Sequence, residues 1–327
     1  MNTDYIVSLS SARSKFALYV SIPICLISII GELFSLLVLL SLKTFRQNSC
    51  AFYLLSMSLF NVIRFIFSTS LIAISMAFPV NFISILFYYC QIRNLIVATC
   101  NLSAITCLCL AIIDQYFATC SRPHWQQWST IRIAHRVTII ITLIWICHAI
   151  PYFIYFDQLS IVNPALCIST NSILIQYHTY VYLITYGNLF PFIAVIFGLM
   201  AFRNARTLTT RTNPLVRREL DKQLTTMVLV EICIYVCTYV PYSITNAISS
   251  LNTNRDLVFL AQLNLINAIT LTLSFLSNGN SFYTYVCVSK RFRRQTKYVL
   301  YEMYMNRCQQ KRIQPNNMEI HAETEKQ

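Results

Sequence analysis

Charged residues and glycine are both scarce in this chain. Of its 327 residues, 11% are charged and only 4 are glycine, whereas 56% are hydrophobic. A soluble globular protein carries about 25% charged residues and roughly 7% glycine, so this composition excludes an ordinary soluble domain. The chain also lacks an internal repeat and a Gly/Ser-rich linker. We therefore expect a single unit whose core is a helix bundle in lipid.

Seven long apolar stretches are separated by short polar loops. Each stretch reaches or exceeds the roughly 20 residues that a helix needs to cross a bilayer. The predicted spans are Phe16–Leu42, Ala51–Phe78, Phe87–Ile113, Val137–Phe156, Leu174–Phe202, Leu224–Ser250 and Leu257–Ser289. The predicted fold class is an all-α integral membrane protein, a seven-transmembrane helix bundle.

Positive charge lies almost wholly in alternate loops. The loops after the first, third and fifth stretches, together with the C-terminal tail, hold 20 of the 25 Lys and Arg residues. Because basic residues are retained on the cytoplasmic side, we expect the N-terminus outside and the tail inside. The net charge of +13 then reflects a cytoplasmic face beside anionic lipid head groups, and a nucleic-acid partner is not expected.

Most of the 13 cysteines fall within predicted spans or on the cytoplasmic side, where a reduced thiol is a small apolar residue. Cys90, at the outer start of the third stretch, and Cys167, in the outer loop after the fourth, are the two placed to meet in an oxidising compartment. A disulfide between them would hold that loop across the mouth of the bundle. The alternative is two free thiols.

Cys90 and Asp114 are 24 residues apart, or roughly 36 Å of helix, which is enough to cross the ~30 Å hydrocarbon core. The run Asp114, Gln115, Tyr116 resembles the inner end of the third helix in rhodopsin-like (class A) G-protein-coupled receptors, where Asp-Arg-Tyr stands at this distance from a disulfide cysteine. Gln115 occupies the arginine position. Three further residues match helix landmarks of that family: Trp145, Pro191 and Pro241.

Several positions depart from the family pattern. Glu32 follows Gly31 where the family has Gly-Asn, and Asn61 replaces the usual aspartate of the second span. Since Asn61 has no charge to hold an ion, the family's sodium pocket is expected to be absent or weakened. Tyr239 stands two residues before Pro241, where a tryptophan is usual. Of the family's Asn-Pro-x-x-Tyr motif, only the tyrosine, Tyr285, is kept.

The resemblance implies a receptor that tilts its inner helix ends, around Pro241, to expose a groove for a heterotrimeric G protein. Asp221 is the acid expected opposite Gln115. Glutamine cannot make the bidentate charged pair that arginine makes, so we hypothesise a weaker inactive-state lock and altered coupling. Neutral drift is the alternative. The expected G-protein contacts are Asp114, Gln115, Tyr116, Arg203, Arg217, Arg218 and Lys222.

The resemblance also implies a pocket that opens outward between the third, fifth, sixth and seventh spans. The residues expected to line it are Val97, Asn101, Tyr180, Leu183, Tyr239, Asn246 and Asn267, with Arg93 one turn below the rim. Val97 stands where amine receptors carry an aspartate, so a monoamine is disfavoured. An uncharged mouth of Tyr and Asn suits a peptide or a small neutral molecule. The other charges placed within spans are Glu32, Arg64 and Glu231, and such groups are expensive in lipid.

The residues after Tyr285 form an amphipathic pattern over 290–306, which predicts a helix on the inner leaflet. The resemblance identifies it as the family's short eighth helix. Cys308 is a candidate for palmitoylation, with a plain thiol as the alternative. The expected organisation is an extracellular N-terminus over 1–15, the bundle over 16–289, this helix, and a disordered cytoplasmic tail over 307–327.

Other membrane classes fit less well. A retinal protein needs a lysine in the seventh stretch, which has none, and a transporter would show repeated halves and Gly-rich interrupted helices. The 5 histidines form no cluster at metal-ligand spacing, so neither an enzyme nor a cofactor is expected. The prediction is a plasma-membrane, multi-pass receptor for an extracellular ligand. The alternative is a chemosensory seven-helix channel subunit or an uncoupled receptor.

Overall fold

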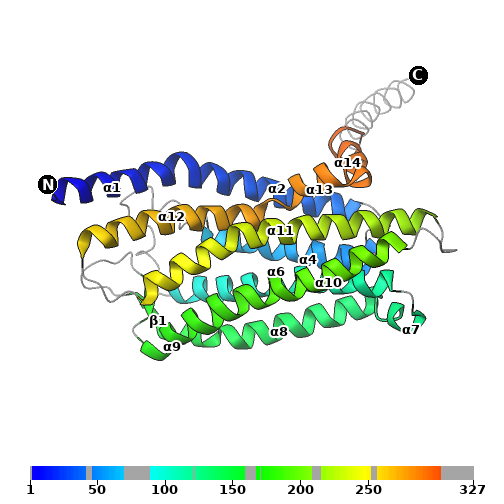
Figure 1. The fold of residues 1–327 in the computed structure, drawn as a ribbon, viewed down its shortest axis with the longest axis horizontal. Helices are drawn as coiled ribbons and strands as arrows, with labels where there is room; N and C mark the ends of the chain where they lie inside the picture. Colours follow the sequence, from blue (N-terminus) through cyan, green and yellow to red (C-terminus); the bar gives the residue numbers. More distant parts are fainter. Residues whose placement is uncertain are drawn as a thin grey trace, which may run out of the picture.

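The structure is a computed structural model, and it describes residues 2–41, 46–69, 89–120, 122–158, 167–169, 171–207, 215–251 and 256–302. Within these ranges, seven helices are long and apolar enough to cross a membrane. The sequence predicted seven spans in the same order, and that prediction is confirmed. Figure 1 shows the spans lying alongside one another in a single bundle.

The first four spans are built as follows. The label η marks a π-helical segment. The first span is continuous through α1 (Asn2–Phe16), η1 (Ala17–Ser21) and α2 (Ile22–Ser41), and the second is α4 (Ser49–Arg64) continued by η2 (Phe65–Thr69). The third is α6 (Tyr89–Thr119), followed by the short α7 (Pro123–Gln126), and the fourth is α8 (Ile131–Tyr155). A short hairpin follows, in which β1 (Phe156–Gln158) pairs antiparallel with β2 (Cys167–Ser169).

The remaining spans complete the bundle. The fifth comprises α9 (Ser172–Tyr177), η4 (His178–Tyr186) and α10 (Gly187–Thr207), and the sixth is the single long helix α11 (Leu215–Leu251). The seventh is α12 (Leu257–Gly279), followed by α13 (Ser281–Val288), and the chain then turns into α14 (Lys290–Lys297) and η6 (Tyr298–Glu302). The expected amphipathic helix over 290–306 is therefore helical as far as residue 302, where the description ends.

The two ends of the bundle carry different elements. The start of α1, the hairpin and α9 lie at one end, here called the N-terminal end, whereas α7 and α14 lie at the other, here called the α14 end (Figure 1). The first helix begins at Asn2 rather than at Phe16, because the polar residues before Phe16 continue the same helix and pack on α12. Hydropathy marks where a helix enters lipid, not where the helix itself begins.

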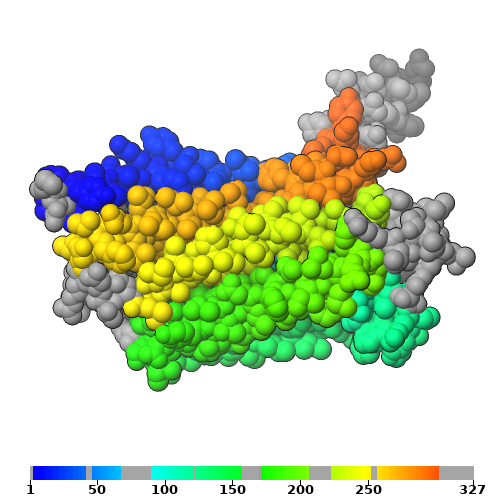
Figure 2. All heavy atoms as spheres, viewed as in Figure 1, coloured from blue at the N-terminus to red at the C-terminus, as the bar shows by residue number. Residues whose placement is uncertain are grey.

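Burial separates a central helix from a peripheral one. About 72% of the most apolar part of α6 is buried, against 17% for α8. The outward face of α8 presents Ile139, Ile140, Leu143 and Ile144, which suits contact with lipid tails. On the face shown in Figure 2, α12, α11 and α10 pack side by side. This arrangement puts α6 where it contacts most of the other spans.

Gly279, the last residue of α12, marks a very close approach between helices. A Cβ atom at this position would lie 2.1 Å from the Cβ and 2.8 Å from the Cα of Ser28 in α2. At Gly198 in α10, an added Cβ would meet the Leu229 Cδ2 atom at 2.6 Å. Leu229 can turn aside, since that atom is the far end of a flexible side chain, but the backbone of α2 cannot.

We expect Gly279→Ala to lower the midpoint of thermal unfolding of the purified protein by on the order of 5 °C, because overpacking costs about 1–3 kcal/mol. Gly198→Ala is the matched control and is expected to change the midpoint little. Equal midpoints for the two variants would contradict the close contact between α12 and α2.

Candidate functional site

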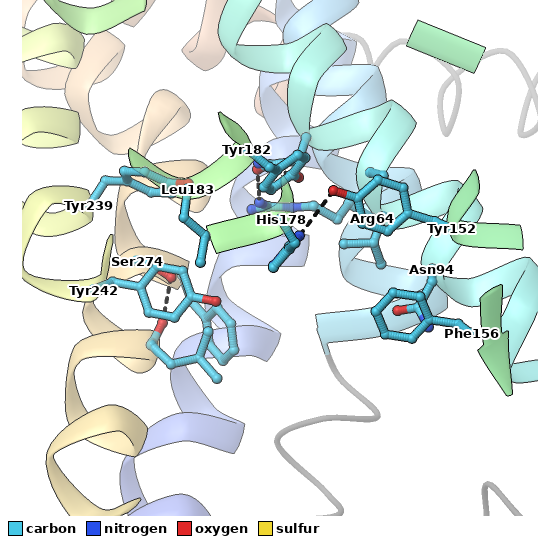
Figure 3. A pocket seen from close by; sticks show the side chains of 15 residues that line it. Arg64, Asn94, Tyr152, Phe156, His178, Tyr182, Leu183, Tyr239, Tyr242 and Ser274 are labelled. Atoms are coloured by element: carbon cyan, nitrogen blue, oxygen red, sulfur yellow. Dashed lines mark hydrogen bonds between the residues drawn. The ribbon is translucent and has the colours of Figure 1, made fainter. Parts of the chain in front are cut away.

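A cavity of about 230 Å³ lies near the N-terminal end of the bundle, since Phe156 of the hairpin strand β1 is among its lining residues. Its walls come from α4, α6, α8, β1, the fifth span, α11 and α12 (Figure 3). The lining residues are Arg64, Asn94, Val97, Ala98, Asn101, Tyr152, Phe156, His178, Tyr182, Leu183, Tyr239, Tyr242, Leu271, Ser274 and Phe275. Ten of these fifteen residues are Tyr, Phe or aliphatic and five are polar or charged, a combination that is usual for a site that binds a small molecule.

Among the described residues of this lining, Arg64 is the one Lys, Arg, Asp or Glu. It is the last residue of α4, and its Nη1 donates a hydrogen bond of 2.6 Å to the Oδ1 of Asn101 in α6. The Nδ2 of Asn101 in turn donates to the Tyr182 hydroxyl at 3.0 Å. The guanidinium carbon lies 5.5 Å from the centre of the Phe65 ring. A chain of hydrogen bonds thus joins the second, third and fifth spans at the cavity wall.

Aromatic contacts extend this wall toward the fourth span. The His178 ring stacks on Tyr182 with ring centres 4.8 Å apart, and its Nδ1 makes a hydrogen bond of 3.0 Å with the Tyr152 hydroxyl. Figure 3 shows Arg64, His178, Tyr182 and Tyr152 gathered on one side of the cavity. Since each ring is held by a neighbour on another helix, this side of the cavity is pre-organised.

Tyr239 forms the opposite wall, in α11. It is buried, stacks on Tyr235 at 4.8 Å, and contacts Tyr242 edge to face. Pro241 lies within α11, between Tyr239 and Tyr242 in the sequence, and cannot donate a backbone hydrogen bond. The aromatic wall therefore stands at a point where the helix is weakened.

Four of the eight residues expected in the pocket line this cavity: Val97, Asn101, Leu183 and Tyr239. The other four, Arg93, Tyr180, Asn246 and Asn267, do not line it. Tyr180 is half exposed on the outer surface of the fifth span. Asn246 donates to the Tyr242 hydroxyl at 3.0 Å and so supports a lining residue from behind.

Sequence reasoning missed the contribution of the second and fourth spans. Arg64 was identified only as an intramembrane charge, and Tyr152, His178 and Tyr182 were not identified. A signal was present, because His178 and Tyr182 are four residues apart and so share a helix face, and a charge within a span usually faces the interior of the bundle.

At the α14 end, three of the residues expected to contact the G protein, Asp114, Gln115 and Tyr116, contact neighbouring spans. The Ser49 hydroxyl donates to the Oδ2 of Asp114 at 2.7 Å, which ties α4 to α6. Gln115 is fully buried, and its Oε1 accepts a hydrogen bond of 3.1 Å from the Thr225 hydroxyl of α11. Tyr116 packs edge to face on Phe197 of α10. A neutral hydrogen bond thus joins the third and sixth spans here, one helical turn from Asp221.

Two buried carboxyl groups meet around Ser281 in the middle of the bundle. The Ser281 hydroxyl donates to the Oε1 of Glu231 in α11 at 2.9 Å. Glu32, in α2, is fully buried and faces the hydroxyls of Ser58 and Ser281, yet neither of its carboxyl oxygens has a hydrogen-bond partner. Ser281 therefore links the sixth and seventh spans by a hydrogen bond and faces Glu32 of the first, at the position where the family has the asparagine of Asn-Pro-x-x-Tyr.

Tyr285 joins this region to α14. Its ring is fully buried and meets Phe292 edge to face at 5.5 Å. The Ser289 hydroxyl accepts a hydrogen bond from the Phe292 backbone N–H and donates to the Oε1 of Gln223 in α11. The start of α14 is thereby docked onto the sixth span.

Other predicted residues fall partly or wholly outside the description. Cys90 is buried at the start of α6 and accepts from the Asn94 amide at 3.8 Å, whereas of Cys167 only the backbone, in β2, is described. Their disulfide stays a prediction. Cys308 and the side chains of Asp221, Arg217 and Arg218 lie outside the described residues.

Comparison with protein families settles the class. A family model described as "7 transmembrane receptor (rhodopsin family)" matches residues 31–283. The chain belongs to the rhodopsin family of seven-transmembrane receptors. A search of curated proteins gives no match. The matched region of this rhodopsin-family receptor includes the cavity, Gln115 and both buried glutamates.

The family assignment confirms the resemblance that the sequence suggested and gives the class of protein, a G-protein-coupled signalling receptor. Members of this family act as receptors. In the described part of this receptor, no group of three or more His, Cys, Asp or Glu could hold a metal ion. Three of the departures from the family pattern are Gln115, Glu32 and Ser281, and all three are buried. Gln115 and Ser281 are hydrogen-bonded to another span.

We expect Ser281→Ala to lower the thermal midpoint of the purified receptor by several degrees, because a buried Glu231 oxygen that loses its donor costs about 1–3 kcal/mol. In a Glu231→Leu background, the same change has no buried oxygen to expose and is expected to cost much less. A double-mutant cycle measures the difference. Additive effects would show that Ser281 and Glu231 are not coupled.

Proposed function

We propose that this receptor sits in the plasma membrane with its N-terminus outside, takes an extracellular ligand into the N-terminal-end cavity, and activates heterotrimeric G proteins at the α14 end. The distribution of Lys and Arg supports this orientation. The observation that carries the proposal is that one helix, α11, contributes both to the cavity wall and to the hydrogen bond with Gln115.

The mechanism follows from that shared helix. A ligand that displaces Tyr239 or Tyr242 acts on α11 beside Pro241, where a backbone hydrogen bond is missing. Tilting of the inner part of α11 then breaks the hydrogen bond between Thr225 and Gln115. A neutral hydrogen bond contributes roughly 0.5–1.5 kcal/mol, less than a charged pair, so the closed state of this receptor is held weakly at that contact.

The outer and inner surfaces complete the proposal. A disulfide between Cys90 and Cys167 holds the hairpin over the cavity, since β2 carries Cys167 and β1 contacts α6. At the other face, α14 lies near anionic lipids through Lys290, Arg291, Arg293 and Arg294. Palmitoylation of Cys308 would add a second anchor.

The ligand is a small molecule in preference to a peptide. The cavity volume of about 230 Å³ is below the roughly 300–1,000 Å³ of sites that bind drug-sized ligands. The sequence indicated a peptide or a small neutral molecule because of the Tyr and Asn residues expected at the mouth of the pocket. Arg64 lines the same cavity and adds a positive charge to it.

A receptor that does not couple to G proteins is the second candidate, because Gln115 stands at the position of the family's arginine. The two are separated by nucleotide exchange on a panel of purified G proteins with membranes that contain this receptor. We expect exchange above the empty-membrane background, and a change of that rate in Gln115→Arg. Silence of both forms at confirmed surface expression, with ligand present, would favour the uncoupled receptor or a channel subunit.

We expect Thr225→Val to raise ligand-independent exchange by a few fold, up to about tenfold, because it removes the donor to Gln115 at a cost of roughly 1 kcal/mol. Thr226→Val is the matched control, since the Thr226 hydroxyl donates only to the Lys222 carbonyl of its own helix at 2.9 Å. If both variants leave the basal rate unchanged, the Gln115 contact does not hold the inactive state.

A further inference from the structure

The cavity contains the cation Arg64, and no acidic side chain stands among the described residues that line it. Arg64 is 9% exposed. Its Nη1 donates to Asn101, whereas Nε and Nη2 have no hydrogen-bond partner. None of the fifteen described lining residues is Asp or Glu (Figure 3). A buried charge left without a counter-charge is costly, so this site favours a partner that supplies one negative charge.

The unpaired atoms of Arg64 have a definite geometry. Nε and Nη2 form one edge of the planar guanidinium, and their N–H groups point the same way. A carboxylate matches that edge with two parallel hydrogen bonds, the strongest arrangement that arginine makes. Asn101 occupies Nη1 and fixes the plane of the group through its own bond to Tyr182. The unpaired edge of Arg64 is therefore fixed in orientation, and its two nitrogens lie buried in the wall of the cavity.

Glu32 does not fill this role. It lies within electrostatic range of Arg64, but its carboxyl group faces Ser58 and Ser281 and neither oxygen accepts a hydrogen bond. The tyrosines around Arg64 offer neutral hydroxyls. Within the described part of the bundle, Glu32 thus acts on the charge of Arg64 through space, and the Nε and Nη2 groups of Arg64 donate no hydrogen bond.

We propose that the cavity binds a small organic carboxylate, with the carboxylate on the Nε and Nη2 edge of Arg64 and an apolar or aromatic body against Tyr152, Phe156, Tyr242 and Phe275. This proposal rests on the proposed function, in which the cavity is the ligand site. A single cation among aromatic walls suits one negative charge better than a phosphate dianion, whose second charge would stay uncompensated. The size of the cavity limits the body to about one ring or a short chain.

The test uses the purified receptor without G protein. Thermal unfolding is followed with acetate, benzoate and 3-phenylpropanoate, each against its primary amide, which has nearly the same shape and no charge. At least one carboxylate is expected to raise the midpoint in a dose-dependent manner, while the amides do not. Arg64→Gln is expected to raise the half-saturating concentration at least about tenfold, since two charged hydrogen bonds are lost.

Two further variants keep the test decisive. Arg64→Lys retains the charge but cannot make the bidentate pair. It is therefore expected to bind the carboxylate more weakly than the natural receptor and more tightly than Arg64→Gln. Arg13→Gln changes an arginine of α1 that does not line the cavity and is expected to have no effect. Equal shifts by amides, a loss of binding in Arg93→Gln but not in Arg64→Gln, or no shift by any carboxylate would overturn the proposal.

The test also stands apart from the test of coupling. Carboxylate binding without nucleotide exchange would support the ligand class and contradict G-protein activation. Exchange stimulated by another compound, with no carboxylate binding, would do the reverse.

Discussion

Lipid supplies no hydrogen bonds, so every polar group that this chain carries into the membrane must be satisfied by another part of the chain or by a ligand. That constraint explains why the buried polar residues are connected across helices. Ser49 holds Asp114, Thr225 holds Gln115, Ser281 holds Glu231, and Asn101 holds Arg64. Each bond joins two different spans, so the polar contacts fix which helix faces which, while the apolar residues provide most of the packing.

The same constraint makes it informative to ask which buried polar groups have no hydrogen-bond partner. Two nitrogens of Arg64 and both carboxyl oxygens of Glu32 have no partner. They lie at different depths, the first at the cavity and the second at the junction of the first, second and seventh spans. Arg64 lines a described cavity, whereas Glu32 is fully buried. The distinction between a binding group and a structural one therefore depends on access, which burial alone does not give.

Much of the fold could be predicted because hydropathy and charge patterns follow from the order of the residues alone. Seven apolar stretches and the alternation of basic loops do not require knowledge of any contact. The site was harder, because it depends on helix rotation and on pairs far apart in sequence. Val97, Asn101, Leu183 and Tyr239 were found from depth and helical spacing, whereas Arg64 and Tyr152 were missed because the second and fourth spans were not expected to line the cavity.

The departures from the family pattern show a similar limit. The sequence indicates that Gln115 cannot pair as an arginine does, and Asp221 is the acid expected opposite it. Among the described residues, Gln115 accepts a hydrogen bond from Thr225, one turn further along α11, and the pairing with Asp221 stays a prediction because its side chain lies outside the description. A substitution in a motif thus predicts that a contact changes, while the replacement contact depends on three-dimensional placement.

The length of α11 sets how large a motion the cavity can produce. Leu215 begins the helix and Pro241 lies 26 residues later, which is ~39 Å along the axis. A tilt of about 10° at the proline would move the far end by ~7 Å, while side chains beside the cavity would shift by only ~1 Å. In the proposed mechanism, a ligand of one ring would act through this long lever against hydrogen bonds that include the one between Thr225 and Gln115. A small change of shape at the cavity would then give a wide opening at the α14 end.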